Sequence, residues 1–432
     1  MILYFKQAWN LIKQEKLFSS LYIIGTGLSI TIVMVLSIVY YIKIANIYPE
    51  TDRDRMLVIK SGIENSDKDG LSRGQLSLNV IETCFRSLQE AEAVSAVYTP
   101  YGKEHYVQPE GKKEQLPVAV KYVDNAFWTV FSFRFLYGKP FTDADFQSGI
   151  HTTVISGSLA KQLFGTTNVI GNSISLNFIP YRICGVVKDV SFVTGNSYAQ
   201  LWIPYTTDPE HKDFFAYGGT LGNMNAYILA PAKNHLDKIR NQAIENIDKF
   251  NQTMQDDIEF SVLGQPDRYW QSVFRTYSSQ EVNFNKIVWE YLLIFLVLLL
   301  VPGISLSGMT DSRMERRLSE MGLRRVFGAP VNTLMQQIIT ENFLFTFFGG
   351  IIGLLFSYLF LLVSSDWIMG IGETWGNEPP EGTIVAFTPA MMMNIPVFLI
   401  ALGVCFLLNL LTAIIPAWRA SHRNIIYSLN AK

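Results

Sequence analysis

The sequence predicts an α-helical membrane bundle of four transmembrane helices, with a large α+β extracytoplasmic domain inserted between helices 1 and 2. Three observations predict this fold class: four long uncharged apolar runs, one long segment of mixed hydrophobicity, and Lys and Arg residues gathered on one side. The 49% content of hydrophobic residues is also high for a wholly soluble protein. The uncharged runs are Leu17–Ile42, Tyr291–Met309, Asn342–Ser365 and Ala390–Trp418.

Each run is long enough to cross a hydrocarbon core of about 30 Å. Apolar residues and lysines alternate before the first run, as in an amphipathic helix that lies on the inner leaflet. The expected segments are an amphipathic helix at 1–16; membrane helices at 17–43, 286–310, 331–365 and 390–418; the α+β domain at 44–285; a cytoplasmic coupling helix at 311–330; a short external loop at 366–389; and a cytoplasmic tail at 419–432.

The positive charges set the predicted orientation. Long translocated domains are exempt from the positive-inside rule, so the segment from Lys43 to Lys286 is set aside, and the eleven remaining Lys and Arg residues all fall on one side of the bundle. The loop at 366–389 has acidic residues but no Lys or Arg. We therefore expect a multi-pass protein of the cell inner membrane with both termini in the cytoplasm. The positive residues are Lys6, Lys13, Lys16, Arg313, Arg316, Arg317, Arg324, Arg325, Arg419, Arg423 and Lys432.

The connector at 311–330 reads as a short amphipathic helix. Ser312 and Glu315 have the spacing of a capping box, and Gly328 and Pro330 supply a stop. Its arginines can dock a cytoplasmic protein, or they can only fix orientation and contact the headgroups of membrane lipid. The net charge of −2 argues against a nucleic-acid partner.

The inserted domain interleaves strand and helix patterns without a βαβ repeat, so we expect an α+β fold in two subdomains. Expected strands are Met56–Lys60, Val94–Thr99, Val118–Val123, Thr153–Ser156, Ile174–Phe178, Tyr181–Val187, Ala226–Leu229 and Ile258–Leu263. Expected helices are Ser77–Leu88, Ser158–Phe164 and His235–Phe250.

No catalytic constellation stands out. The sequence lacks the phosphate loop G-x-x-x-x-G-K-[ST], the H-E-x-x-H helix and the G-x-S-x-G elbow. Asp143 with Asp145, or Asp256 with Asp257, could form an acid/base pair, but such carboxylates in turns are more often solvated. The five histidines show no ligand spacing. We therefore expect no enzyme site, cofactor or metal in this chain.

The cysteines leave two readings open. Cys84, Cys184 and Cys405 each lie in an apolar pattern and are expected to be buried thiols. A disulfide between Cys84 and Cys184 is the alternative, because both residues lie outside the cytoplasm.

A few polar and small residues interrupt the spans. Glu341 is the one ionisable residue well inside a span, and such an acid is costly unless it faces a partner or cavity; it could also lie only at headgroup depth. Asn409 is expected to form an interhelical hydrogen bond. Close helix packing is expected at the small-residue pairs Gly25 with Ser29 and Gly349 with Gly353.

Several local sequences together carry a family resemblance. They are EMGLRRVFGAP followed by ITENFLFTFFGGIIG in the connector and third span; LYGKPFTDADF, VISGSLAKQLFG, VIGNSISL and YRICGVVKDV in the outer domain; and AIIPAWRASHRNIIYSLNAK at the end. These sequences resemble the MacB/FtsX-type permeases of ABC transporters. The resemblance covers nearly the whole chain, although Ile425 and Ile426 stand where that family often has a proline.

The resemblance implies a permease subunit that works with a separate cytoplasmic ABC ATPase subunit, which binds the ATP. It also implies a dimer with a second copy or a related permease, contact with a periplasmic adaptor or outer-envelope protein, and mechanotransmission that drives export or extraction of a substrate. ATPase-coupling residues would then be Arg313, Glu315, Arg316, Arg317, Glu320, Arg324, Arg325, Gly328 and Pro330. Two alternatives share this architecture: an FtsX-like regulator of an outer partner such as a cell-wall hydrolase, and a membrane sensor.

Overall fold

The structure is a computed structural model of the chain. It describes residues 13–14, 16–66, 70–100, 104–111, 114–208, 219–254, 258–275, 281–294, 296–298, 323, 326–328, 330–364 and 395–422. These residues form two compact units. Among the described residues, the outer unit is built from Ile42–Phe284, and the helical unit contains those up to Tyr41 and those from Asn285 onward.

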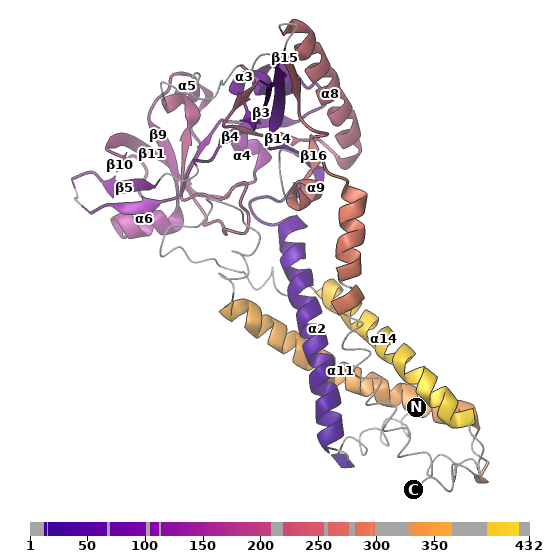
Figure 1. The fold of residues 1–432 in the computed structure, drawn as a ribbon. Helices are drawn as coiled ribbons and strands as arrows, with labels where there is room; N and C mark the ends of the chain where they lie inside the picture. The colour runs from indigo at the N-terminus through magenta and orange to yellow at the C-terminus, as the bar shows by residue number, and fades with distance from the viewer. Residues whose placement is uncertain are drawn as a thin grey trace. The chain divides into compact units, whose positions relative to one another are not determined.

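A mixed β-sheet is the centre of the outer unit (Figure 1). Its strands are β1 (Met56–Ile59), β4 (Ala93–Tyr98), β5 (His105–Pro109), β6 (Leu116–Val118), β7 (Val120–Val123), β8 (Phe135–Gly138), β9 (Thr152–Ser156), β10 (Ser173–Leu176), β11 (Ile179–Val187), β12 (Leu201–Pro204), β14 (Asn225–Leu229) and β16 (Asp267–Arg268). Within the described residues the order is β16-β1-β14-β4-β7-β12-β9-β11-β10-β5-β6, and β8 also pairs with β11. The pairs β7 with β12 and β9 with β11 are parallel, whereas the other pairs are antiparallel.

A smaller sheet and several helices complete the outer unit. The small sheet has the order β13-β3-β2-β15, formed by Leu221–Gly222, Gly70–Leu76, Gly62–Ser66 and Ile258–Ser261. The helices are α3 (Leu78–Val80) continued by the π-helical turn η2 (Ile81–Phe85), α4 (Phe127–Val130), α5 (Asp143–Gln147), α6 (Gly157–Phe164), α8 (Leu236–Thr253) and α9 (Tyr269–Phe274). Short 3-10 turns are η1 (Arg53–Arg55), η3 (Tyr205–Thr207) and η4 (Lys233–His235).

Both faces of the central strands are buried. In β1, Leu57 and Ile59 pack into one apolar cluster with α8, whereas Met56 and Val58 pack into a second cluster with α4. Side chains alternate between the two faces of a strand, so a strand covered on both sides is apolar throughout. A third cluster lies between α6 and the strands around β9 and β11.

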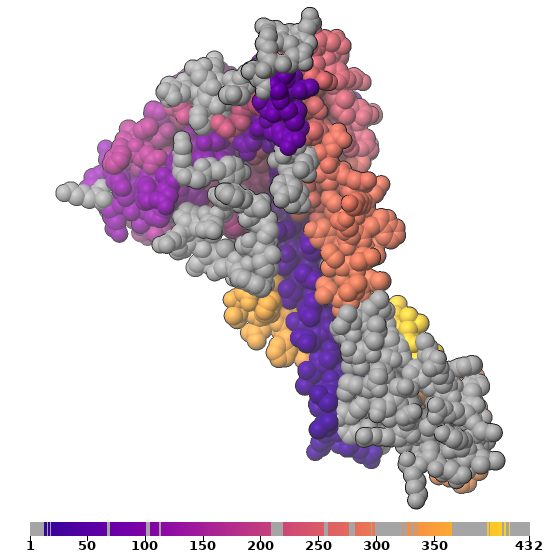
Figure 2. Space-filling model, viewed as in Figure 1, coloured from indigo at the N-terminus to yellow at the C-terminus, as the bar shows by residue number. Residues whose placement is uncertain are grey.

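The helices of the outer unit cover opposite ends of this sheet. Figure 1 shows α8 at the end near β14 and β16, and α6 at the end near β5 and β10. Figure 2 shows the same division on the surface, with the rose-pink side chains of α8 on one side and the purple and magenta side chains on the other. The buried stripe of α8 repeats every three or four residues and consists of Leu236, Ile239, Ala243, Ile247 and Phe250.

The helical unit contains long apolar helices. They are α2 (Lys16–Ile44), α11 (Val331–Val363) and α14 (Ile395–His422), and residues 285–294 and 296–298 are also helical. Within the described residues, Ser19–Ile44 and Met335–Val363 are long and apolar enough to cross a membrane, and Phe398–Leu407 is a shorter apolar stretch. The expectation of four spans stays a prediction, because 301–322 and 365–394 lie outside the described residues.

The α+β class of the outer domain is confirmed. Every expected strand overlaps an observed strand, and the expected run Val118–Val123 divides into β6 and β7. Strands β2, β3, β5, β8 and β12 were not predicted, and neither were the two-residue strands β13 and β16.

Candidate functional site

Most of the predicted ATPase-coupling residues lie outside the described residues: Arg313, Glu315, Arg316, Arg317, Glu320, Arg324 and Arg325. The two residues expected to shape the end of the connector are described. Gly328 has φ of +87°, in the left-handed region that favours glycine. Pro330 has extended backbone and directly precedes α11, where its missing N–H costs the helix no hydrogen bond.

Helices α2 and α11 cross at glycines. A Cβ atom on Gly353 would lie 2.6 Å from the Gly27 carbonyl oxygen and 2.9 Å from Ile30 Cβ, so no larger residue fits without movement. On Gly349 it would lie 2.9 Å from Thr26 Cβ. The predicted small residues Gly349 and Gly353 therefore lie at a close helix approach.

The partner of these glycines on α2 was not predicted. Sequence analysis singled out Gly25 and Ser29, and in the structure the Ser29 hydroxyl donates to the Gly25 carbonyl at 2.8 Å within the helix. The crossing instead uses Gly27, and the Thr31 hydroxyl donates to the Gly353 carbonyl across the two helices at 3.1 Å. Gly25, Gly27 and Ser29 are so close in sequence that their spacing alone does not show which one faces α11.

Glu341 lies in a buried polar seam on the N-terminal half of α11. Glu341 is 2% exposed, and Gln337 Nε2 donates a hydrogen bond to the Glu341 carboxylate at 3.0 Å. One residue further, Asn342 accepts a hydrogen bond from the Tyr22 hydroxyl of α2 at 3.0 Å. The seam therefore joins the two helices by polar contacts as well as by the glycine crossing.

The remaining predicted residues are placed as follows. Asn409 lies in α14, and its side chain is outside the described residues. Cys84 and Cys405 are buried, Cys184 is half-buried, and all three are free, so the alternative of a Cys84–Cys184 disulfide is wrong. Cys84 and Cys184 pack in different apolar clusters, which keeps the two thiols apart.

Of the two carboxylate pairs considered as acid/base pairs, the first, Asp143 with Asp145, helps to begin a helix. Asp145 closes a capping box with Thr142 at the start of α5. Hydrogen bonds from the backbone and hydroxyl of Thr142 lower the pKa of Asp145. Asp256 and Asp257 lie outside the described residues.

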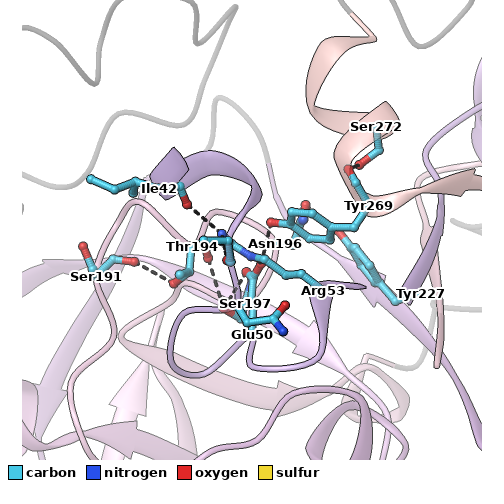
Figure 3. Close-up of polar contacts among 12 residues, drawn as sticks. Ile42, Glu50, Arg53, Ser191, Thr194, Asn196, Ser197, Tyr227, Tyr269 and Ser272 are labelled. Carbon is cyan, nitrogen blue, oxygen red and sulfur yellow. Dashed lines mark hydrogen bonds and ion pairs between the residues drawn. The ribbon is translucent and has the colours of Figure 1, made fainter. Parts of the chain in front are cut away.

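The outer unit contains a buried ionic network that the sequence analysis did not identify (Figure 3). Glu50 is fully buried and accepts hydrogen bonds from three other segments. Arg53 Nε and the Tyr269 hydroxyl donate to Glu50 Oε2 at 2.8 and 2.6 Å. The backbone N–H and the hydroxyl of Ser197 donate to Glu50 Oε1 at 2.9 and 2.8 Å. Both carboxylate oxygens are thus satisfied.

Arg53 connects this carboxylate to the end of α2. Its Nη1 donates to the carbonyl oxygens of Ile42 and Ala45 at 2.7 and 2.8 Å. Ile42 lies in the last turn of α2, and Ala45 directly follows the helix. Carbonyls in the last turn of a helix have no partner within that helix. The guanidinium carbon also lies 4.7 Å from the centre of the Tyr269 ring. A single cation therefore contacts the helix end, Glu50 and α9.

The electrostatics keep this network ionised. Burial alone would raise the pKa of Glu50, but the Arg53 charge and the hydrogen bonds from Tyr269 and Ser197 outweigh it and lower that pKa. Burial and the neighbouring Glu50 charge raise the pKa of Tyr269 well above its usual value, so its hydroxyl stays protonated and donates. A signal was available in the sequence, since Glu50 and Arg53 are opposite charges three residues apart just after a membrane span.

A second buried ion pair lies at the other chain exit of the outer unit. Arg275 Nε and Nη2 donate to the two Asp267 carboxylate oxygens at 2.5 and 2.9 Å. The two side chains are 2% and 1% exposed. Arg275 follows α9 directly, and its guanidinium carbon lies 5.6 Å from the centre of the Phe284 ring. Together the two hydrogen bonds form a bidentate pair, which fixes the relative orientation of the two side chains as well as the distance between them.

Two family descriptions match this chain. Residues 19–245 match the MacB-like periplasmic core domain, and residues 291–425 match the FtsX-like permease C-terminal domain. The first match covers more than half of the chain. Together they include most of the outer unit, the connector and most of the helical unit.

Curated relatives and solved structures carry related names. The uncharacterized ABC transporter permease YknZ of Bacillus subtilis is 23% identical over 57% of this chain and 58% of that protein. The macrolide export ATP-binding/permease protein MacB of Burkholderia cenocepacia is 26% identical over 62% of this chain and 38% of that protein. The chain thus spans between about two fifths and three fifths of the length of these relatives.

Two solved domains were also matched. The extracellular domain of YknZ from Gram-positive bacteria has a TM-score of 0.33 at 16% identity, covering 47% of this chain and 99% of that domain. The periplasmic region of MacB from Actinobacillus actinomycetemcomitans has a TM-score of 0.34 at 14% identity, covering 47% of this chain and 88% of that region.

Proposed function

This chain belongs to the MacB-like and FtsX-like permeases of ABC transporters, and from this premise we propose that it is the permease subunit of a MacB-type transporter whose motor is a separate cytoplasmic ABC ATPase. ATP is bound by that partner subunit. When the ATPase subunits close on ATP, they push the connector at 311–330. The membrane helices carry this movement to the outer unit, where it drives export or extraction of a substrate.

One observation carries this proposal: both family matches occur in one chain and in the order that the mechanism needs. The MacB-like core begins at the first span, and the FtsX-like region contains the arginine-rich connector between two later spans. A short connector helix bounded by Ser312 and Gly328 can transmit a push, and the turn at Gly328 and Pro330 leads directly into α11.

The assembly has further partners in this proposal. A second copy of the chain, or a related permease, completes a dimer on two ATPase subunits. A periplasmic adaptor or another outer-envelope protein receives the movement of the outer unit. The exposed apolar side chains of the long helices suit contact with lipid, and they include Leu21, Ile24, Leu28, Leu355, Leu359, Leu399 and Leu407.

Charge reversal in the connector tests the motor assignment. The double variant Arg324→Glu/Arg325→Glu should insert in the membrane as before, but the recovery of the ATPase subunit with the tagged permease should fall at least about tenfold. The reason is that each charge-assisted hydrogen bond contributes about 1.5–3 kcal/mol and a tenfold change needs about 1.4 kcal/mol.

The control is the double variant Arg419→Glu/Arg423→Glu, which makes the same charge change on the predicted cytoplasmic tail. Its recovery of ATPase should stay close to that of the wild type. Unchanged recovery with the connector variant, or an equal loss with the tail variant, would contradict docking at the connector.

A further inference from the structure

The small sheet of the outer unit ends in strand β15. In the part of the chain that the structure describes, the order is β13-β3-β2-β15, and β15 pairs with β2 on one side and with no strand on the other. The edge of a sheet presents backbone N–H and C=O groups that can pair with a strand of another chain, so native proteins cover or interrupt such edges. The contacts along β15 show how this chain covers its edge.

A side-chain amide of α8 takes the place of a neighbouring strand at Phe260. The Phe260 N–H donates to Asn251 Oδ1 at 3.0 Å, and Asn251 Nδ2 donates to the Phe260 carbonyl oxygen at 2.8 Å. An antiparallel neighbour would form the same two hydrogen bonds with one residue, one from its N–H and one to its C=O. The Asn251 carboxamide therefore supplies the donor and the acceptor that one residue of a strand would supply.

The register shows that these backbone groups point away from β2. Phe260 is directly opposite Glu64. Antiparallel residues alternate between those that exchange hydrogen bonds with the opposite residue and those whose N–H and C=O point to the other side. Phe260 and Ile258 are of the second kind. Two residues beyond Phe260, the Val262 carbonyl accepts from the backbone N–H and from Nε2 of Gln265 at 3.1 and 2.9 Å, so a second amide covers the chain that follows the strand.

The same contact also fastens the C-terminal end of α8, but that end has other attachments. Ile247 and Phe250 belong to its buried stripe, and the rings of Phe250 and Phe260 lie 6.4 Å apart. Elsewhere on α8, Asn246 bonds to a carbonyl and a hydroxyl of two different residues. At Asn251 both bonds go to the backbone of one edge residue, which is the pattern that strand pairing needs.

We propose that Asn251 is a placeholder for a β-strand, and that it keeps the β15 edge closed to the same strand of a second copy of this chain. A second copy is the partner that fits, because two identical antiparallel edges are self-complementary, each supplying the N–H and C=O groups that the other needs. This inference goes beyond the proposed function and does not depend on it, since it concerns contacts within the outer unit.

Asn251→Ala opens the edge without changing the strand itself. Full-length protein is reconstituted in lipid nanodiscs at one copy per disc, and association between discs is measured by sedimentation velocity. The dissociation constant between discs should fall at least about tenfold relative to the wild type, because exposed strand edges associate at micromolar concentrations. Hydrogen exchange of the Phe260 amide, which has lost its acceptor, should be faster in dilute samples of the same variant.

Two variants separate edge opening from a general loss of stability. Asn246→Ala is the matched control on the same helix, since Asn246 Nδ2 donates to the Cys84 carbonyl and the Ser87 hydroxyl at 2.8 and 3.1 Å and covers no strand edge. Its discs should associate no more than the wild type. Asn251→Ala/Ile258→Pro should return association to the wild-type level, because proline at an outward-pointing N–H leaves the pairing with β2 intact and blocks an added strand.

Unchanged association in folded Asn251→Ala would overturn the proposal. So would equal association in Asn246→Ala, or association that the proline does not reverse. If Asn251→Ala does not fold, Asn251→Ser is measured in its place, because its short hydroxyl cannot reach both backbone groups of Phe260. No nucleotide or ATPase is present in these measurements, so their outcome is separate from that of the motor assignment.

Discussion

Glu50 shows how one residue takes its role from its surroundings rather than from its type. Its carboxylate has no contact with water, and four donated hydrogen bonds from Arg53, Tyr269 and Ser197 hold it ionised. Removal of any donor would leave the buried negative charge of Glu50 less well compensated. Such a loss commonly lowers the free energy of unfolding by several kcal/mol. The network therefore stabilises the outer unit only while the carboxylate stays deprotonated.

The stability of the protein should depend on pH through this residue. The pKa of Glu50 is lowered in the folded state from its usual value of 4.5. Its contribution is therefore fully present above about pH 4.5 and is lost as the pH falls through the lower folded-state pKa, by about 1.4 kcal/mol for each unit of the shift. The free energy of unfolding of full-length protein in detergent, measured between pH 7 and pH 3, should fall less steeply in Glu50→Gln than in the wild type. Equal slopes would contradict an ionised Glu50.

Some residues could be understood from the sequence and others could not. In LYGKPFTDADF, Gly138 and Asp145 read as parts of a turn, and Gly138 has φ of +68° with its would-be Cβ 2.2 Å from the Cys184 carbonyl oxygen. The spacing of Glu50 and Arg53 indicates an ion pair, but nothing in the local sequence indicates that the pair is buried. It lies in the charged sequence PETDRDR, which looks like an exposed loop, and its partners Ser197 and Tyr269 are distant in sequence.

At the scale of elements, close approach of α2 and α11 depends on glycine. The Gly353 position meets the backbone of Gly27, which cannot move aside as a flexible side chain could. On α14, by contrast, a Cβ atom on Gly403 would have no atom of the described residues within 4 Å. The two glycines therefore provide a test and its control within one bundle.

Gly353→Ala should push the two helices apart and lower the stability of the helical unit by about 1–3 kcal/mol, the usual cost of overpacking. Gly403→Ala should be neutral or slightly stabilising, since alanine is the better helix former. Thermal unfolding of both variants in lipid nanodiscs checks this difference. Equal midpoints for the two variants would show that the glycine crossing does not hold these helices together.

Several predicted strands differ from the missed strands β2 and β3 in the β-branched and apolar residues of their own sequences. The expected runs near β1, β4, β9 and β14 contain apolar or β-branched residues at most positions and are buried along nearly their whole length. Strands β2 and β3 have the sequences GIENS and GLSRGQL, and β3 is largely exposed or half-buried. Their pairing depends on neighbours rather than on their own apolar pattern, so a single sequence gives little sign of them.

At the scale of the whole molecule, the chain combines a MacB-like outer domain with an FtsX-like membrane region. The order of hydrophobic runs was sufficient to predict this division, because membrane spans are limited by bilayer thickness and charge placement. The crossing at Gly27 and the network around Glu50 depend on contacts between distant segments. These contacts depend on how the segments pack in three dimensions, and the spacing of apolar residues along the sequence does not predict that packing.

The central claim is that a cytoplasmic, accessible connector receives force from an ATPase. Sided labelling of a single cysteine tests it most directly, with Ser319→Cys in the connector and Lys161→Cys on α6 as the reference for the outer side. A membrane-impermeant thiol reagent should label Ser319→Cys only in inverted vesicles and Lys161→Cys only in right-side-out vesicles, and added ATPase should protect the first site. Labelling of Ser319→Cys from the outside, or no labelling from either side in folded protein, would contradict the account.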